Sequence, residues 1–410
     1  MLDFFPMSTH RLYYDDSYLQ SFDARVLSCI PAEPFSSDSG IIPAWEIILD
    51  QSAFYPTSGG QPNDLGCLGD AKVLAVRDDR EDIVHIVERE LPLGVIQGAI
   101  QWRRRFDHMQ QHTGQHLLSA MFQERFGLPT VSFHLGLELC TIDLRGPEPK
   151  ADLLEGAQRA ANIVIFEDRP IHVRYGTAAQ FAEIGVRKQV EREGLLRAIE
   201  IESADLQPCG GTHLRSTGQI GMTLVRRCTK IRQVWRVEFA CGSRAERFAT
   251  SDFQVLRTVA DRLRCIPEEI LPTVDKLATE RDAHFKSLRE ISQQLAEARA
   301  ELIVAATPAT NGIRLIAQTL QGPQSELLLP LASEIAKKEK TIALLVAEDS
   351  GLLIFAQHAS VGKDMQALLE TVSAAFPAKG GGTKDFVRAK LAASEHAAAA
   401  LDLARSSILG

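Results

Sequence analysis

The sequence of 410 residues contains no apolar run of the roughly 18 residues that a transmembrane helix requires. Its first residues, MLDFFPMSTHRLYYDD, lack the basic start, apolar run and small-residue cleavage site of a secretory signal peptide. Low-complexity tracts and clear internal repeats are absent as well. Hydrophobic residues make up 45% and charged residues 24%, which is typical of a soluble globular protein. We therefore expect a cytoplasmic protein of about two to four domains.

The seven cysteines are an odd number scattered along the chain, which argues against a disulfide framework. We expect reduced and mostly buried thiols, one of which is available to bind a metal. The net charge of −8 argues mildly against a nucleic-acid partner, but phosphate contacts depend on local clusters of basic residues. Residues 103–105 form one such cluster and residues 226–236 contain another. Each cluster is either a solvated charged face or a contact for phosphates.

The first 250 residues divide into two regions of different pattern. Residues 1–100 contain short strand-like runs bounded by Gly, Pro, Asp and Asn, with the spacing of a small barrel or folded sheet. Residues 101–250 mix helices and strands, beginning with a helix predicted over residues 106–126 that ends at Gly127-Leu128-Pro129. This mixture predicts an α+β domain.

The remaining residues predict an arm and a tail. Between residues 272 and 302 an apolar heptad pattern, interrupted by Arg281 and His284, predicts a helical hairpin arm or a short coiled coil. Intramolecular packing and dimerisation remain alternatives for this arm. From residue 307 the pattern predicts an α/β unit, with a hairpin across Asp349-Ser350-Gly351 and a glycine triplet within residues 379–385.

Histidines recur at every fourth position of the predicted helix, at His108, His112 and His116. Residues four apart lie on the same helix face, so two of the three can bind one ion, but the periodicity does not choose the pair. A second motif, Cys209-Gly210-Gly211-Thr212-His213, follows Pro208 in a predicted loop. Together the two motifs offer three imidazoles and a thiolate, which suit tetrahedral zinc. Satisfied structural histidines are the alternative.

These motifs resemble those of one family. His112-Thr113-Gly114-Gln115-His116-Leu117-Leu118 with Cys209-Gly210-Gly211-Thr212-His213 resembles the editing domain of alanyl-tRNA synthetases and of their free-standing trans-editing relatives, called AlaX. The loop Ser58-Gly59-Gly60-Gln61-Pro62-Asn63-Asp64 is similar to the glycine-rich motif of that family's barrel domain, although the pattern alone favours a plain turn. Residues 11–19, RLYYDDSYL, resemble the start of the longer free-standing members. The glycine triplet after a helical arm is similar to the C-terminal DHH-associated domain of the synthetases.

The resemblance implies a multidomain α+β fold with four parts. They are a β-barrel over residues 1–100, a two-layer α+β editing domain over residues 101–250, a helical or coiled-coil arm over residues 251–306, and a tRNA-binding and dimerisation domain over residues 307–410. It implies a zinc-dependent deacylase that maintains translation fidelity by hydrolysing seryl-tRNA(Ala), and glycyl-tRNA(Ala) as a second substrate. The zinc ligands implied are His112, His116, Cys209 and His213. No segment before the barrel is large enough for an aminoacylation domain, so charging of tRNA is not expected.

Two positions depart from the family pattern. Gln115 stands where threonine often precedes the second histidine, which puts the preference for serine in doubt more than the reaction type. Asn63 stands where glycine is usual in the loop, which predicts an altered turn.

We assign roles at the site as hypotheses. The backbone N–H groups of Gly210 and Gly211, or of Gly59 and Gly60, are candidate donors to the negative charge that develops on the carbonyl oxygen. His134 is either a polar wall or proton shuttle, or a satisfied structural histidine. Candidate partners of the serine hydroxyl, whose unpaired groups would penalise alanine, are Gln115, Ser132, His134 and Gln61.

Contacts with tRNA are expected at the basic residues Arg226, Arg227, Lys230, Lys379 and Lys384. Three rival functions remain open at this point. The first is editing of threonyl-type tRNA, and the second is a non-catalytic tRNA-binding protein with structural zinc. The third is a DHH-type phosphoesterase, which needs clustered aspartates that Asp107-His108-Met109 does not supply.

Overall fold

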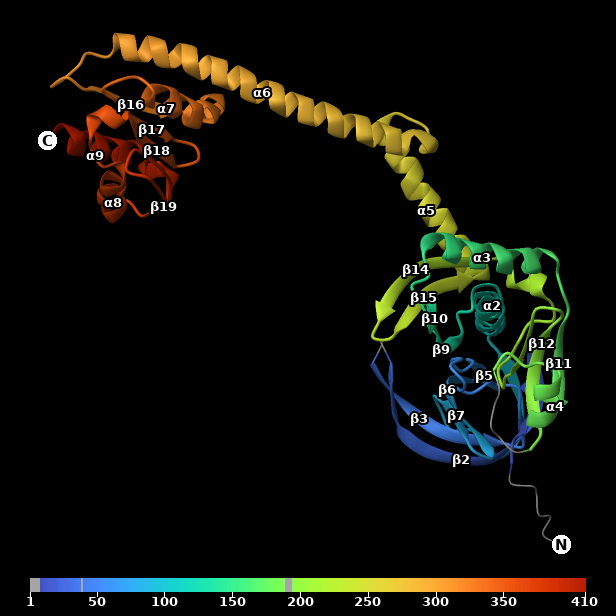
Figure 1. Cartoon of the computed structure of the whole chain (residues 1–410). Coiled ribbons are helices and arrows are strands. Elements are labelled where there is room, and N and C mark those ends of the chain that lie inside the picture. The colour runs from blue at the N-terminus through green and yellow to red at the C-terminus, as the bar shows by residue number, and fades with distance from the viewer. Residues whose placement is uncertain (1–7, 38–39, 189–193) are drawn as a thin grey trace, which may run out of the picture. The chain divides into compact units, whose positions relative to one another are not determined.

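The computed structural model describes residues 8–37, 40–188 and 194–410 (Figure 1). The chain forms two compact units, residues 1–258 and residues 259–410, and helix α5 (Gly242–Leu263) runs across their boundary. Helices and strands are mixed in both units, which confirms the predicted α+β multidomain class. Among the described residues, none of the helices has the length and apolar character needed to cross a membrane.

The N-terminal part of the first unit is a closed ring of six strands, in the order β2-β3-β7-β6-β5-β8 with β8 returning to β2. The sequence alternates apolar and polar residues along these strands, so one side of each packs into the core that includes Phe22, Ile47 and Phe54. Short parallel strands β1 (His10–Arg11) and β4 (Gln51–Ser52) hold helix α1 (Leu12–Asp15) beside the ring. The ring strands are β2 (Ser21–Ser37), β3 (Gly40–Leu49), β5 (Gly66–Leu68), β6 (Ala71–Asp79), β7 (Asp82–Val87) and β8 (Gly94–Ile100).

The rest of the first unit is built around helix α2 (Trp102–Phe126). It begins four residues before the predicted start and ends at Gly127, whose φ of 65° is the left-handed cap that glycine favours. Helices α3 (Ala151–Phe166) and α4 (Ala178–Glu183) and the 3₁₀ helix η1 (Thr217–Ile220) accompany two antiparallel sheets. One sheet is β14 (Thr223–Ile231), β15 (Val234–Cys241), β10 (Cys140–Leu144) and β9 (Thr130–Leu135); the other is β11 (Ile171–Gly176), β12 (Leu196–Ile201) and β13 (Asp205–Pro208).

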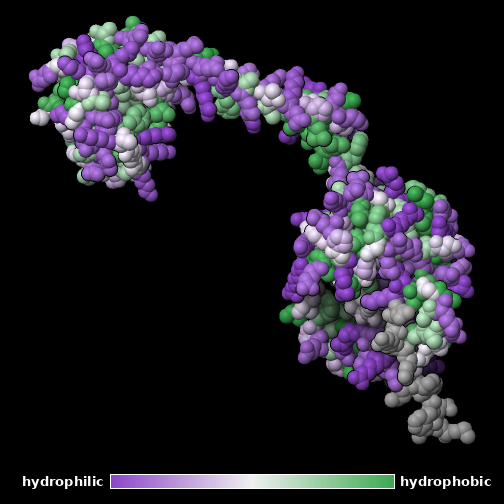
Figure 2. Space-filling view, viewed as in Figure 1, coloured by the Kyte–Doolittle hydropathy of each residue, from purple (hydrophilic) through white to green (hydrophobic). Residues whose placement is uncertain are grey.

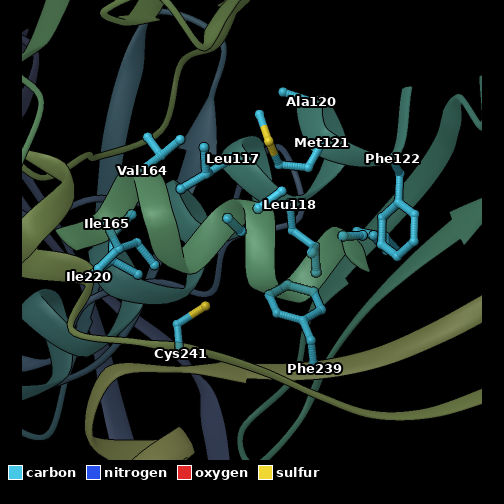
Figure 3. Close-up of a cluster of buried hydrophobic side chains, with 14 of the residues drawn as sticks. Leu117, Leu118, Ala120, Met121, Phe122, Val164, Ile165, Ile220, Phe239 and Cys241 are labelled. Atoms are coloured by element: carbon cyan, nitrogen blue, oxygen red, sulfur yellow. The ribbon is translucent and has the colours of Figure 1, made fainter. Parts of the chain in front are cut away.

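Helix α2 is buried on nearly every side between His108 and Phe122. Its apolar residues Leu117, Leu118 and Phe122 pack against α3 and the four-stranded sheet (Figure 3). Burying each such side chain contributes about 1.5–3 kcal/mol. At Gly114 an added Cβ would lie 2.2 Å from the sulfur of Cys241, so only glycine lets the helix approach this closely. The helix that carries the histidine motif is therefore fixed in the core.

The second unit is a five-stranded sheet covered on both faces. Helices α6 and α7 pack on one face, and α8 and α9 pack on the other. The strands, in sheet order, are β16 (Arg314–Leu320), β17 (Thr341–Ala347), β18 (Leu352–Gln357), β20 (Phe386–Leu391) and β19 (Ala378–Gly382). The helices are α6 (Ile270–Ala306), α7 (Leu328–Ala336), α8 (Met365–Ala375) and α9 (Ala397–Leu409), and short 3₁₀ helices are η2 (Pro267–Glu269), η3 (Gly322–Leu327), η4 (Ala359–Val361) and η5 (Ser394–His396).

The heptad region is one continuous helix of 37 residues, not a hairpin. Only Ala296 and Ala300 of this helix are buried, and α6 packs against α7. The apolar residues of the heptad, such as Leu288 and Ile291, are exposed at 56% and 61%. In Figure 2 hydrophilic residues predominate over the visible face, with apolar residues scattered among them.

Candidate metal centre

Four side chains from two distant segments meet in the first unit. His112 and His116 come from α2, and Cys209 and His213 come from the loop after β13. Their ligand atoms all lie within 4.8 Å of one another, and the cluster is largely buried. The Cys209 sulfur lies 3.5 Å from Nε2 of His112 and 3.3 Å from Nε2 of His213. In a tetrahedral zinc site, a nitrogen and a sulfur ligand are about 3.5 Å apart, so the donor set fits this ion.

His108, the third histidine of the helix, lies outside this group. It is buried, and its Nδ1 has no hydrogen-bond partner among the described residues. Burial, together with the charges of Arg104 and Arg244, lowers the pKa of His108 to about 3. The geometry therefore selects the pair that the sequence periodicity left undecided.

The Nδ1 atom of each histidine in the cluster contacts a neighbouring polar side chain. Such contacts orient the ring and fix the tautomer, so that the other nitrogen is left for an ion. The partners come from three different elements, and sequence analysis identified none of them in this role. They are Gln61 for His112 at 2.8 Å, Asp205 for His116 at 3.2 Å, and Thr113 for His213 at 3.2 Å.

The electrostatics favour the metal-binding form of the thiol. Burial by itself raises the pKa of Cys209, but attraction to His112 and His213 outweighs it and the pKa falls well below its usual value. Burial by itself lowers the pKa of His116, but its interactions with Asp205 and Cys209 together outweigh burial and the pKa rises to about 9. Asp205 also pairs with Arg187 at 2.7 Å. Because the thiolate is the species that binds metals, the cluster is prepared for an ion.

A cavity of about 1100 Å³ lies beside the cluster. His116 and Cys209 reach it on one side. Its other walls come from the glycine-rich loop, from strand β9 and from the N-terminal segment that includes Tyr14. Tyr14 also lies under the guanidinium of Arg197, which is 5.4 Å from the ring centre. The cavity is therefore large enough for a small amino acid together with part of a nucleotide.

The glycine-rich loop is a tight two-residue turn that also lines the cavity. Ser58 and Gln61 exchange backbone hydrogen bonds of 2.9 and 3.1 Å across Gly59 and Gly60, whose φ angles are 55° and 83°. A Cβ at Gly60 would lie 2.9 Å from the ring of Phe133. Asn63 lies outside the two-residue turn, and its side chain forms hydrogen bonds with the hydroxyl of Thr57 and the carbonyl of Asp64.

Gln61 is not placed to contact a substrate, contrary to the sequence prediction. Its side chain is fully buried and does not line the cavity. Its oxygen contacts Nδ1 of His112 and accepts the backbone N–H of Thr212 at 3.2 Å, and its nitrogen donates to the Thr212 hydroxyl at 2.8 Å. With both ends of the amide occupied inside the protein, a ligand cannot engage it.

Gly211 is also engaged within the cluster. Its backbone N–H donates to the sulfur of Cys209 at 3.3 Å, so it is not available to an oxyanion. An added Cβ would lie 2.2 Å from the ring of His112, which explains the glycine. Both glycines line the cavity, but Gly210 is exposed whereas Gly211 is buried.

His134 is not brought to the cavity. It is exposed on β9, where the alternation of the strand directs it away from the face on which Phe133 contacts the ring of His112. Ser132 lines the cavity, but its hydroxyl donates to Asp143 at 2.7 Å.

Gln115 is buried and lines the cavity beside His116. Its nitrogen donates to the hydroxyl of Ser119 at 2.9 Å, and the hydroxyl of Thr130 donates to the same oxygen at 2.8 Å. The carbonyl oxygen of Gln115 has no hydrogen-bond partner among the described residues. Gln115 belongs to the histidine motif, whereas no sequence pattern marks the hydroxyls of Ser119 and Thr130 that fix its amide.

The predicted basic residues are spread over both units. In the first unit Arg226 pairs with Asp252, Arg227 is exposed, and Lys230 lies 5.5 Å from the ring centre of Trp235. In the second unit Lys379 and Lys384 are exposed at the β19–β20 hairpin, where Lys379 faces Lys390 across the strands.

The basic cluster at residues 103–105, for which a solvated face and a phosphate contact were the two alternatives, contains one buried arginine. Arg105 is fully buried and forms a bidentate ion pair with Asp64, at 2.5 to 3.1 Å. It also donates to the carbonyls of Ser17 and Ala53.

Comparison with known proteins gives consistent matches. Residues 196–238, which include Cys209 and His213, match the family described as "Threonyl and Alanyl tRNA synthetase second additional domain". The chain is 30% identical over 351 residues to "Alanyl-tRNA editing protein Aarsd1-B" of Xenopus laevis, covering 83% of this chain and 84% of the relative. It is 28% identical over 400 residues to "Alanyl-tRNA editing protein AlaX-L" of Pyrococcus horikoshii, covering 93% and 95%. It is 29% identical to "Alanine--tRNA ligase" of Pyrococcus abyssi, covering 93% of this chain and 42% of the ligase.

Proposed function

The chain belongs to the family of alanyl-tRNA editing proteins, and from this premise we propose that it hydrolyses the ester of mischarged tRNA(Ala). The observation that supports this most is the convergence of His112, His116, Cys209 and His213 beside a cavity of about 1100 Å³. Seryl-tRNA(Ala) is the proposed main substrate and glycyl-tRNA(Ala) the second. The relatives are named as alanyl-tRNA editing proteins, which favours this reading over editing of threonyl-type tRNA.

We propose zinc as the ion of the cluster. The four residues that would hold it offer one thiolate and three imidazoles, the set that zinc prefers. When bound, zinc supplies Lewis-acid polarisation and lowers the pKa of a water molecule to about 7. Four protein ligands are also compatible with a structural ion. The test of function therefore measures metal content together with ester hydrolysis.

Selectivity against alanine is assigned to Gln115. The Ser119 oxygen accepts hydrogen bonds from the Thr130 hydroxyl and from the Gln115 amide nitrogen. The amide oxygen of Gln115 is therefore the atom available to a ligand in the cavity. A serine hydroxyl can donate to this oxygen, whereas an alanine methyl group leaves it unpaired when water is excluded. An unpaired buried acceptor costs about 1–3 kcal/mol.

Negative charge on the ester carbonyl oxygen needs hydrogen-bond donors at the cavity wall. The backbone N–H groups of Gly59, Gly60 and Gly210 are the proposed donors, because these three residues line the cavity. The guanidinium of Arg197 stabilises the loop around Gly210 by donating hydrogen bonds to the carbonyls of Cys209 and Gly211.

We also propose a division of the chain into four domains. The strand ring of residues 1–100 corresponds to the family's β-barrel, residues 101–250 to the editing domain, residues 251–306 to the arm, and residues 307–410 to the DHH-associated domain. The proposed contacts with the phosphates of tRNA are made by Arg226, Arg227, Lys230, Lys379 and Lys384. The exposed apolar heptad of α6 supports a homodimer through the arm and tail, and the proposed location is the cytoplasm.

A single-turnover deacylation panel tests the proposed function. It uses the full chain of known zinc content with seryl-tRNA(Ala), glycyl-tRNA(Ala), alanyl-tRNA(Ala) and seryl-tRNA(Thr). We expect hydrolysis of the first two substrates, with alanyl-tRNA(Ala) and seryl-tRNA(Thr) spared. Stoichiometric zinc without cleavage of any ester would support the non-catalytic alternative, and preferred cleavage of seryl-tRNA(Thr) would support the threonyl one.

A further inference from the structure

Gln61 is the one residue of the glycine-rich turn that reaches the histidine and cysteine cluster instead of the cavity. Its oxygen lies 2.8 Å from Nδ1 of His112, and its side chain is fully buried. The turn belongs to the strand ring, whereas His112 lies in α2, 51 residues further along the chain. This contact therefore joins the ring to the metal centre.

The orientation of the Gln61 amide is fixed by its neighbours. A backbone N–H is always a donor, and the N–H of Thr212 points at the Gln61 oxygen at 3.2 Å. The oxygen end of the amide must therefore face both Thr212 and His112. Because this oxygen only accepts, Nδ1 of His112 must carry the hydrogen, which leaves the lone pair on Nε2. Nε2 is the atom that lies 3.5 Å from the Cys209 sulfur.

We propose that Gln61 is a positioning residue of the metal centre, which holds His112 in the tautomer and ring orientation that bind the ion. This inference rests on the proposed metal site. It gives the glycine-rich loop a second role beyond lining the cavity: the loop completes the metal centre from outside the two motifs that supply the ligands.

Several features hold Gln61 in this place. Gly59 and Gly60 turn the chain sharply before it, and the ion pair between Asp64 and Arg105 ties the following residues to α2. Arg105 precedes His112 by about two helical turns, so the ion pair sets the distance between the loop and the histidine. Gly211 packs closely against this contact, because a Cβ at this position would lie 3.0 Å from the Gln61 oxygen.

The proposal predicts opposite results for two substitutions of similar size. Gln61→Met removes the acceptor, and loss of such an orienting partner lowers metal affinity by about 10–100-fold. Gln61→Glu keeps an acceptor for both His112 and Thr212, and the hydroxyl of Thr212 can rotate to donate to it. A zinc ion with one thiolate retains positive charge, which compensates the added carboxylate. We therefore expect Gln61→Glu to bind zinc at least as tightly as the wild type.

The test measures zinc affinity of the full-length chain by competition with a chromophoric chelator. Cobalt(II) absorption of the same variants reports the geometry of the ligands independently of hydrolysis. Asn63→Ala is the matched control, because it removes side-chain hydrogen bonds of the same loop without touching His112. We expect wild-type affinity for the control and the glutamate variant, and a 10–100-fold loss with an altered cobalt spectrum for Gln61→Met.

Wild-type affinity in Gln61→Met, or an equal loss in Asn63→Ala, would overturn the proposal. If Gln61→Met does not fold, Gln61→Asn takes its place, since it keeps a buried amide but withdraws the oxygen from His112. Wild-type affinity and cobalt spectrum in that variant would contradict the proposal equally. Failure of the proposed function is separate, because it would appear as absent hydrolysis in a wild-type protein that binds zinc.

Discussion

The carbonyl oxygen of Gln115 is a buried acceptor without a partner among the described residues, beside a cavity. We predict that Gln115→Leu lowers kcat/KM for seryl-tRNA(Ala) by about 10–100-fold, because the serine hydroxyl loses its acceptor. The value for alanyl-tRNA(Ala) should rise, because alanine no longer leaves a buried acceptor unpaired. Ser119→Ala is the control: it frees the amide to turn and should lower selectivity less. An unchanged ratio of the two kcat/KM values in Gln115→Leu would exclude the assigned role.

His85 makes stability depend on pH at a position away from the cluster. Burial lowers its pKa to about 4, and its ring contacts Ser52 and the carbonyl of Ile47. The unfolded chain takes up the proton near pH 6.5, before the folded protein does, so the stability of the neutral form is lost as the pH falls from 6.5 towards 4.

This loss can be measured by urea unfolding at two pH values. From pH 7 to pH 5, His85 should remove about 2 kcal/mol of unfolding free energy. Over the same pH interval, the unfolding free energy of His85→Gln should fall by about 2 kcal/mol less than that of the wild type. An equal loss in both proteins would show that His85 is not responsible.

The individual residues around the histidine and cysteine cluster were only partly predictable from the sequence. The two motifs contain the donors themselves, but the choice of His112 and His116 over His108 came from the family resemblance and not from the helical spacing. Gln61 was predicted to contact the substrate, whereas the structure buries it against His112, because which way a loop side chain points depends on the packing of a distant helix. Asp205 and Thr113 were missed for the same reason: neither belongs to a spacing pattern.

At the scale of elements, the attachment of α2 to the glycine-rich loop depends on the buried pair of Asp64 and Arg105. We predict that Asp64→Asn lowers the unfolding free energy of the first unit by about 3–5 kcal/mol, because it leaves a buried guanidinium without its counter-charge. Arg103→Ala on the same helical turn is exposed and should cost less than about 0.5 kcal/mol. Denaturant unfolding measures both, and a small effect of Asp64→Asn would mean that the pair does not fix the helix.

The elements themselves were predicted unevenly. The helix over residues 106–126 and the hairpin across residues 349–351 were confirmed, because apolar periodicity and a turn motif specify them locally. Strand β19 was missed because its glycine triplet has no apolar alternation, although a Cβ at Gly380 or Gly382 would collide with the backbone of β20. The heptad of α6 indicated a helix, but nothing in its spacing determined whether that helix folds back.

At the scale of the whole molecule, the predicted four regions form two compact units. The strand ring and the α2 region belong to one unit, and side-chain contacts such as Asp64 with Arg105 and Gln61 with His112 join them. Contacts between residues 41 or 51 positions apart leave no periodic pattern in the sequence. The sequence therefore predicted two separate domains where the strand ring and the α2 region pack as one unit.

We propose that the second unit contributes to tRNA binding through the β19–β20 hairpin. Lys379 faces Lys390 across the strands, an unfavourable pair that a phosphate backbone would relieve. We predict that Lys379→Gln with Lys384→Gln weakens tRNA binding and lowers the slope of log affinity against log salt by about one per lysine. Lys276→Gln, on α6 beside Glu280, is the control and should leave the slope unchanged. An unchanged slope in the double variant would place the phosphate contacts elsewhere.

We propose that ester hydrolysis depends on an ion held by the cluster of His112, His116, Cys209 and His213. The most direct test removes metal from the full chain with a chelator and follows single-turnover hydrolysis of seryl-tRNA(Ala) while zinc is added back. We predict that hydrolysis is lost, returns in proportion to bound zinc up to about one ion per chain, and is not restored in His116→Ala, which should not retain zinc. Full hydrolysis by the zinc-free protein, or by His116→Ala, would show that hydrolysis does not depend on this ion.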